Sequence, residues 1–481
     1  MKLRINWLGK FNRLILLGVF FHIAFSAASL DFTLKASGTY STETNNAFFV
    51  DGSLALEHQE GPFSTSWSLV ADSKGTYPEP FFRDFFGPFT FNLENAGFVY
   101  QESPISMWLG KLPIEDEIES PYSLFISGMS PSLINGGLRF EGRNFTFSNL
   151  WVGLDINART DLFMAGSSKN IYRDRGVVIR TYEYRLGNLK VGYQDSTVFV
   201  DSYFNVNVFA IPAPSYFVQY VLAAKGRPGS QYANMNSLEG LFADYEGQGW
   251  RAYAQVLIDD FNMNRFINPS GYQNPDKIAW SLGGAIDLPL GTLGIYTAGA
   301  TKYTFASLGD DFYSYTTHPS SAVISDGQTV AVPLEEQMLG YIHGENNIAL
   351  KATWGAPLAD TDLEMGMEIV LSGAKSPANP WHNGEDYLAL GTQLLNDPVL
   401  ETKILLDVRA SREFGNFTLF AKAAGGYIFN RLTPVYPGSS GYPLIAYGDG
   451  TTMNEPIFIP KAGDSGLIGE ISLGGSWKLG L

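Results

Sequence analysis

The chain has 481 residues, with 48 acidic against 32 basic side chains, a formal net charge of −16 and no cysteine. The acidic balance argues against a nucleic-acid-binding surface, and the absence of cysteine excludes disulfides and thiolate metal sites. The 34 Phe, 25 Tyr and 9 Trp, together with 51 Gly and few helix-like stretches, favour a chain built from strands and turns.

The N-terminal residues predict a secretory signal peptide. Four basic residues lie within residues 1–13, an apolar run follows at 14–25, and small residues occupy 26–29. The run is short for a membrane-crossing helix, so we expect residues 1–28 to be cleaved and residues 29–481 to form a single domain. Cleavage removes four of the 32 basic residues and leaves 28 against 48 acidic ones, a net charge of −20.

Eighteen segments alternate apolar with small or polar residues at a period of two, which predicts strands with one apolar face. Most are close to the length that a tilted strand needs to cross a membrane. In chain order they are 31–42, 47–58, 63–73, 91–102, 105–111, 134–142, 145–156, 176–186, 188–199, 236–246, 250–260, 278–288, 292–303, 346–355, 363–371, 399–412, 417–428 and 467–481.

Short and long connections alternate between these strands. Gly187-Asn188 is one of the short turns and 200–235 one of the long links, while 43–46 is a short link where the alternation expects a long one. A soluble sandwich has no reason to segregate its loops in this way. We therefore expect an all-β, transmembrane, antiparallel up-and-down β-barrel of about 18 strands (16–18) in the bacterial outer membrane, with short periplasmic turns and long extracellular loops.

The last eleven residues, ISLGGSWKLGL, carry apolar side chains on one face and small or polar ones on the other. The pattern resembles the C-terminal assembly signal of bacterial outer-membrane barrels, which implies outer-membrane lipid and the barrel-assembly machinery as partners. The residues that carry the signal are Leu473, Trp477, Leu479 and Leu481. Leu481 departs from the usual pattern, in which the last residue is Phe or Trp.

The segment RAYAQVLIDDF, residues 251–261, places Tyr253, Gln255 and Asp259 on the face opposite a row of small apolar side chains. Because the apolar row suits lipid, we expect these three residues to face the lumen. The strand starts at a short turn, so Asp259 belongs at the extracellular mouth. There it either marks the point at which the strand leaves the membrane or lines a mouth that a ligand passes.

Catalytic motifs are missing from the sequence, which has no Gly-x-Ser-x-Gly elbow, His-Glu-x-x-His pair or Walker loop. We therefore expect a protein that is not an enzyme and has no cofactor. His318 and His343 lie in or beside one long link, but their spacing is not that of metal ligands on one element, and we expect no metal site.

Several motifs in the middle of the chain resemble, in their order, the Wzi-like capsule-assembly barrels. The resemblance is firm over residues 172–355 and loose elsewhere. The motifs are YRDRGVVIRTYEYRLGNLKVGYQDSTVF (172–199), NSLEGLFADYEGQGWRAYAQVLIDDF (236–261), GIYTAGATKYTF (294–305), YSYTTHP (313–319) and YIHGENNIAL (341–350). One departure is that the chain after the signal enters a strand almost at once, where the best-known member of the family has a periplasmic helical element.

The resemblance implies a non-enzymatic outer-membrane barrel that helps to hold surface polysaccharide to the cell. We expect the polysaccharide to contact Tyr253, Gln255 and Asp259 on the inner face of the wall, with long loops filling or capping the lumen. On the loop above, the candidate contacts are Tyr313, Tyr315 and His318. The alternative is a porin or channel for small hydrophilic molecules, because eighteen strands can enclose water.

Overall fold

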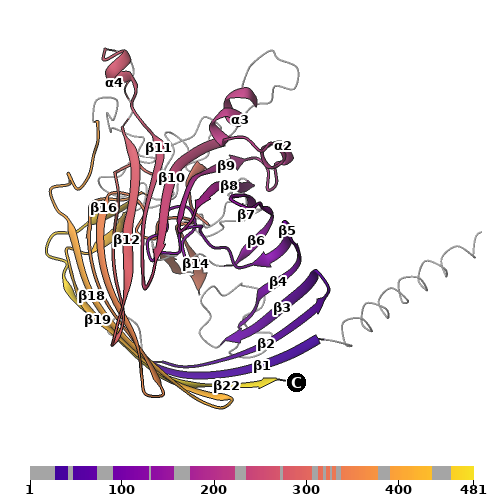
Figure 1. Cartoon of the computed structure of the whole chain (residues 1–481). Coiled ribbons are helices and arrows are strands. Elements are labelled where there is room, and N and C mark those ends of the chain that lie inside the picture. The colour runs from indigo at the N-terminus through magenta and orange to yellow at the C-terminus, as the bar shows by residue number, and fades with distance from the viewer. Residues whose placement is uncertain are drawn as a thin grey trace, which may run out of the picture.

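The wall of the molecule is a closed antiparallel barrel of eighteen strands, seen in the computed structural model of the chain (Figure 1). Neighbours in sequence pair throughout, and the first strand, β1 (Ala28–Ser41), pairs with the last, β22 (Gly466–Gly480), which closes the sheet. The structure describes residues 28–41, 47–72, 90–128, 132–155, 174–222, 235–270, 273, 275–305, 313–317, 321–325, 328–331, 337–376, 391–435 and 457–480.

All eighteen strands predicted from the alternation are confirmed, with ends that differ by at most three residues. Closing the sheet pairs every strand on both edges, so the wall exposes no unpaired edge. Between β1 and β22 the wall strands are β2 (Ala47–Glu60), β3 (Phe63–Asp72), β4 (Thr90–Glu102), β5 (Ile105–Leu112), β6 (Leu133–Glu141), β7 (Phe145–Asp155), β8 (Arg175–Leu186), β9 (Leu189–Val200), β10 (Met235–Gly247), β11 (Trp250–Asp260), β12 (Lys277–Leu288), β13 (Gly291–Ala300), β16 (Asn347–Leu358), β17 (Thr361–Ser372), β18 (Glu401–Phe414) and β19 (Phe417–Phe429).

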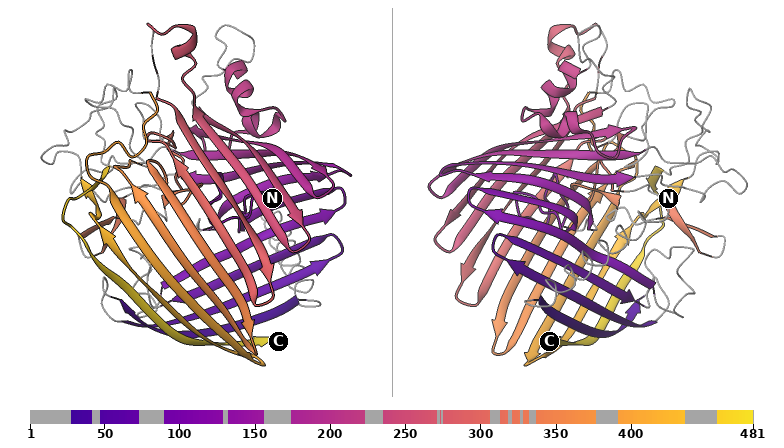
Figure 2. Two further views of the ribbon diagram at one scale, coloured as in Figure 1. Left: turned by 60° about the vertical axis from the view of Figure 1, so that its left-hand side comes forward. Right: turned by 90° about the vertical axis from the view of Figure 1, so that its right-hand side faces the viewer.

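Tight hairpin turns join the strands at one end of the barrel, and the long links lie at the other (Figure 2). Gly187 and Gly415 in two of these turns both have a φ of +62°, a left-handed conformation that glycine adopts without a steric cost. By the rule for outer-membrane barrels, the end with the turns is periplasmic and the end with the long links is extracellular.

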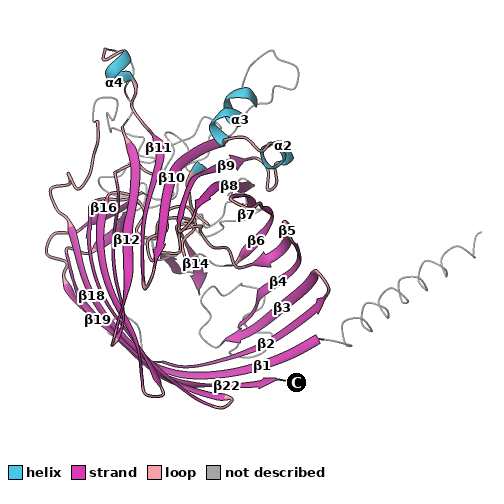
Figure 3. Cartoon of the chain, in the orientation of Figure 1, coloured by secondary structure: helices cyan, strands magenta, loops and turns pink. Residues whose placement is uncertain are grey.

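The long links contain further elements that the sequence did not predict (Figure 3). No described helix is long and apolar enough to span a membrane. These elements are the hairpin of β14 (Ser321–Ser325) and β15 (Gln328–Ala331), the hairpin of β20 (Leu432–Val435) and β21 (Ile457–Pro460), and the helices α2 (Val206–Ala210), α3 (Ser215–Leu222) and α4 (Asn264–Ile267). Residues 1–27 of the predicted signal peptide and the link 43–46 lie outside the described residues, whereas Ala28 is the first residue of β1.

The two faces of the wall differ in chemistry, as the alternation predicts. Large apolar side chains are exposed on the outer face, including Leu241 of β10, Leu282 of β12 and Leu473 of β22. Residues of the opposite face, such as Leu238 and Leu257, are fully buried. Contact with lipid requires a wall with an apolar exterior. The burial of the inner face shows that other parts of the chain fill the lumen at these positions.

Candidate functional site: the filled lumen

Two long links fold into the barrel and fill part of its lumen. Inner loop A is the link between β5 and β6, residues 113–132, of which 113–128 and 132 are described. Inner loop B is the link between β13 and β16, residues 301–346, and its segments 301–305, 313–317 and 337–346 carry the buried residues discussed below. Both links start from strands that run outward, so both belong to the extracellular end and return into the lumen.

Inner loop A bridges opposite sides of the wall. Arg139 of β6 forms an ion pair with Glu117 at 2.6 Å, and the Tyr122 hydroxyl donates to Glu368 Oε1 of β17 at 2.7 Å. β6 is the sixth and β17 the fifteenth of the eighteen wall strands, so the two are nine strands apart, half of the circuit. A loop held at both points crosses the lumen.

Asp116 organises the turn of inner loop A. Its Oδ2 accepts hydrogen bonds from the backbone N–H groups of Phe125 at 2.9 Å and Ile126 at 3.1 Å. Burial raises the pKa of the Asp116 carboxyl, and these hydrogen bonds oppose the rise only in part. A carboxyl with two backbone donors holds the loop in one conformation without help from solvent.

Residues on the inner face of β11 hydrogen-bond inner loop A. Tyr253 and Gln255 are only 6% and 2% exposed, which confirms that they face the lumen. Gln255 Oε1 accepts from the Leu124 N–H at 3.0 Å, and its Nε2 donates to Gln194 of β9 at 3.2 Å. The Tyr253 hydroxyl hydrogen-bonds Ser120 and, at 3.0 Å, Ser281 of β12.

Asp259 meets inner loop B at the outer end of the same strand. Its Oδ2 accepts from the Phe305 N–H at 3.1 Å and lies 3.6 Å from Lys277 Nζ, and its Oδ1 accepts from Asn236 at 3.2 Å. The carboxylate is thus saturated by protein groups. Its placement on the inner face near the extracellular end, predicted from the sequence, is confirmed.

Inner loops A and B are hydrogen-bonded to each other through their backbones. The Ser127 N–H donates to the Leu339 carbonyl at 2.7 Å, and the Tyr341 N–H donates to the Leu124 carbonyl at 3.2 Å. The Tyr315 hydroxyl donates to the Phe125 carbonyl at 2.9 Å. The two loops therefore form one body inside the barrel.

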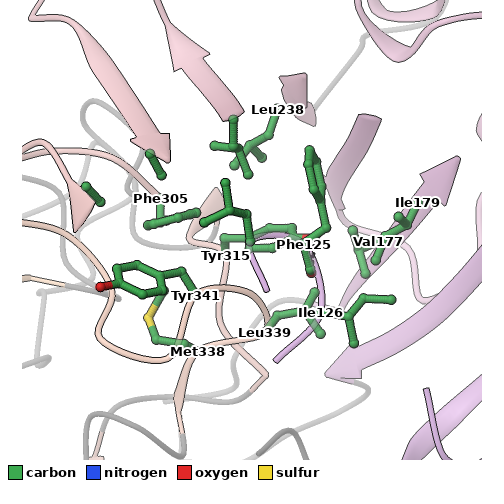
Figure 4. Close-up of a cluster of buried hydrophobic side chains, with 14 of the residues drawn as sticks. Phe125, Ile126, Val177, Ile179, Leu238, Phe305, Tyr315, Met338, Leu339 and Tyr341 are labelled. Atoms are coloured by element: carbon green, nitrogen blue, oxygen red, sulfur yellow. Dashed lines mark hydrogen bonds between the residues drawn. The ribbon is translucent and has the colours of Figure 1, made fainter. Parts of the chain in front are cut away.

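The joined loops share an apolar core with the wall (Figure 4). Phe125 and Ile126 of loop A and Tyr315, Leu339 and Tyr341 of loop B pack together and are all buried. The wall contributes the inward-facing residues Val177, Ile179, Leu238, Leu257 and Val370. Because this core removes apolar area from water on every side, it stabilises the closed arrangement by the hydrophobic effect.

A buried polar cluster connects the two inner loops to β17. His343 Nε2 of loop B lies 3.2 Å from Glu368 Oε1, the same oxygen that accepts from Tyr122. Lys375 Nζ donates to the His343 carbonyl at 2.7 Å. Within the described residues, no three His, Cys, Asp or Glu side chains are grouped as metal ligands.

The structure brings together only some of the ligand contacts predicted from the sequence. Tyr253, Gln255, Asp259 and Tyr315 all hold the inner loops, Tyr313 is half-buried, and His318 lies outside the described residues. Their contact with a ligand stays a prediction. In the predicted assembly signal, Leu473 and Trp477 are exposed on the outer wall, Leu479 lies within β22, and Leu481 is outside the described residues.

Sequence reasoning missed Asp116, Glu117 and Tyr122, because it expected long loops to fill or cap the lumen without identifying this link or its residues among them. One signal was available, the apolar run within PYSLFISG at 121–128, which an extracellular loop in water would not favour. The partners of these residues are far away along the chain, so no local pattern points to them.

The closed barrel, the apolar outer wall and the segregated loops define an outer-membrane β-barrel protein, located in the bacterial outer membrane. No family model and no curated protein matches the sequence. Among solved structures the chain is similar to Wzi of Escherichia coli, described as a carbohydrate-binding β-barrel involved in group 1 capsule assembly, at 11% identity and a TM-score of 0.51, over 96% of this chain and 87% of that one.

Two further solved structures are similar to the chain at lower TM-scores. OccK8 (OprE) of Pseudomonas aeruginosa is 12% identical with a TM-score of 0.48, over 95% of this chain and 98% of that one. OccAB4 of Acinetobacter baumannii is 10% identical with a TM-score of 0.45, over 95% and 99%. At such identities the likeness shows the fold alone, and the relation to Wzi is a distant one between barrels.

Proposed function

We propose that the protein is a non-enzymatic outer-membrane barrel that binds or anchors a surface polysaccharide and assists its assembly at the cell surface. The observation that carries the proposal is the bridged lumen, in which inner loop A joins Arg139 of β6 to Glu368 of β17. A barrel spanned in this way offers its extracellular end as a fixed binding surface instead of a wide pore.

The interior of the loops is unlike a channel lining. Porin lumens are polar and filled with water, whereas Phe125, Tyr315 and Leu339 form a buried apolar core against the wall of this barrel. The core is supported by backbone hydrogen bonds between the loops. Opening a wide path along this part of the lumen would require breaking both.

The ligand class is inferred from the neighbour and from the residue types at the outer end. Wzi, described as carbohydrate-binding, has a TM-score of 0.51 to this chain. Sugar rings stack on aromatic faces, and their hydroxyls bond to carboxylates and amides. Tyr313, half-buried on inner loop B, remains our candidate for such a contact.

A porin remains the second candidate because one sector of the inner face is not covered by the described loops. Arg409 of β18 and Lys422 of β19 are direct cross-strand partners, both exposed, on the face opposite the lipid-facing Val408. Lys422 lies 3.8 Å from Glu470 of β22 in a solvated ion pair. Water beside these charges would give small solutes a narrow route.

Single-channel conductance of the refolded protein in a planar bilayer separates the two functions. The polysaccharide proposal predicts silence or brief, small openings from protein whose folding is verified by heat-modifiable mobility. Large steady openings would contradict the polysaccharide proposal and favour the porin.

A second assay tests the ligand in cells. In a strain that lacks the gene, the fraction of surface polysaccharide released into the medium should rise, and the wild-type gene should restore retention. Unchanged retention in the deletion strain would contradict the proposal even if the barrel is electrically silent.

A further inference from the structure

One extracellular link lies on the outer face of the barrel wall instead of entering the lumen. It runs between β9 and β10, and its described residues 201–222, which include α2 and α3, are called the outer flap below. Asp201 is the only charged residue among its 22 residues, which include three Phe and three Tyr. Figure 1 shows α2 and α3 at the rim of this part of the wall.

The alternation of the wall strands fixes the side on which the outer flap lies. Leu150 and Val152 of β7 belong to the core inside the lumen. Because side chains alternate along a strand, Asn149 and Trp151 face outward. Both bind the flap. Asn149 Nδ2 donates to the Phe209 carbonyl at 2.7 Å, and Trp151 Nε1 donates to a second flap carbonyl, that of Tyr203, at 2.8 Å.

Beneath the outer flap, four polar side chains form a row across neighbouring strands on the outer face. The register pairs Asn149 of β7 with Arg180 of β8, Arg180 with Asp195 of β9, and Asp195 with Glu239 of β10. Ile179 and Val198 face the lumen core, so Arg180 and Asp195 point outward. Charges on the lipid side of a barrel strand are strongly unfavourable.

The outer flap removes these charges from the surface. Arg180 and Asp195 are both 0% exposed and lie 3.4 Å apart. Ser215 at the start of α3 hydrogen-bonds both residues. Its hydroxyl accepts from Arg180 Nη1 at 2.7 Å and donates to Asp195. Its backbone N–H donates to Asp195 Oδ2 at 3.2 Å. Arg180 Nη2 also donates to the Val208 carbonyl. Asp195 lies five residues before the end of β9 at Val200, so the flap folds back along the wall.

The opposite side of the outer flap is apolar and exposed. Val206 is 58% and Phe217 61% exposed, and Phe204 and Tyr216 are exposed as well. Four exposed apolar and aromatic side chains on one short segment are unfavourable in water. Below it, Leu241 of β10 is exposed on the lipid-facing wall, so the segment continues a surface that already contacts lipid.

We propose that the outer flap is a membrane-inserted cover: its aromatic face enters the outer leaflet, while its polar inner side hydrogen-bonds Asn149, Arg180 and Asp195 of the row and covers them. The occupant of the exposed face is therefore lipid, in the manner of an interfacial amphipathic segment. The cover allows this sector of the wall to carry charges without presenting them to the membrane.

Lipid-dependent fluorescence quenching tests the proposal, and the absence of native cysteine makes labelling specific. Single variants Phe217→Cys, Leu282→Cys and Lys461→Cys, labelled with an environment-sensitive fluorophore, are reconstituted in vesicles that contain brominated phospholipid. Leu282 is a lipid-facing reference, and Lys461 is an exposed residue of another extracellular link. We expect quenching at position 217 to match that at 282 and to exceed that at 461 severalfold.

Quenching at position 217 no stronger than at 461 would overturn the proposal. If that position were also shielded from aqueous iodide, a second copy or another protein would cover the face in place of lipid. Ser215→Ala gives an independent readout, because loss of the hydroxyl should loosen the flap and reduce lipid quenching at 217. Unchanged quenching in this variant, with folding verified by heat-modifiable mobility, would contradict the role of the polar row.

Discussion

The Tyr122 hydroxyl of inner loop A donates a 2.7 Å hydrogen bond to Glu368 of β17, on the side of the strand circuit opposite β6. With the ion pair of Glu117 and Arg139 at the other end, this contact carries inner loop A across the lumen. We therefore expect the conductance of the barrel to depend on these few contacts inside the lumen.

Tyr122→Phe should make the barrel open more often. Loss of a hydrogen bond to a charged group costs about 1.5–3 kcal/mol, which is roughly a tenfold or greater change in an opening equilibrium. Single-channel recording measures the frequency of openings. Tyr184→Phe, an exposed tyrosine of β8, is the matched control and should behave as wild type. Equal opening frequencies in the two variants would contradict a bridge at Tyr122.

Asp116→Ala should destabilise the closed arrangement of inner loop A. The substitution leaves the buried N–H groups of Phe125 and Ile126 without their acceptor, at a cost of about 1–3 kcal/mol for each. The free energy of unfolding in urea, followed in detergent micelles, reports the loss. Asp360→Ala, in an exposed periplasmic turn, is the control for removal of a carboxylate, and an equal effect of both would argue against the assigned role.

Asp116 also predicts a pH dependence. Because burial raises the pKa of its carboxyl in the folded state, the native protein keeps the proton at pH values where the unfolded chain has lost it. Its contribution to stability therefore falls as the pH rises from the ordinary carboxyl pKa to the raised one, and is constant outside that window. The difference in unfolding free energy between wild type and Asp116→Asn, measured against pH, should show this decline. A difference that is flat or rises with pH would contradict it.

Leu339→Ala should leave a cavity in the core shared by the inner loops. Leu339 is fully buried between them, and such a truncation costs about 2–5 kcal/mol. Thermal unfolding of the refolded protein measures the effect. Leu282→Ala on the lipid face serves as the control, since no packed neighbour on that side is lost, and it should cost much less.

Tyr313→Ala tests the predicted ligand contact. Tyr313 is half-buried on inner loop B, and its loss should reduce polysaccharide retention severalfold. Tyr315→Phe should make the barrel open more often, because the Tyr315 hydroxyl holds the Phe125 carbonyl. Retention that survives Tyr313→Ala would remove this residue from the candidate site.

The sequence was sufficient to predict the strands of the wall, because a membrane strand is recognisable from its own residues. Alternation placed Tyr253 and Gln255 on the inner face of β11, and the glycine turn at Gly187 located a hairpin. These patterns arise from the two environments of a strand and from the conformation of a tight turn, and both act over a few neighbouring residues.

Only the tertiary structure decided what the long links do. Inner loop A enters the lumen while the outer flap lies against the outside of the wall, although both contain an apolar run with aromatic residues. The deciding contacts join residues that are remote in the chain, such as Tyr315 to Phe125, 190 residues apart, and Tyr122 to Glu368, 246 residues apart. No local period encodes such pairs, because their energy is gained only when the closed barrel brings the partners together.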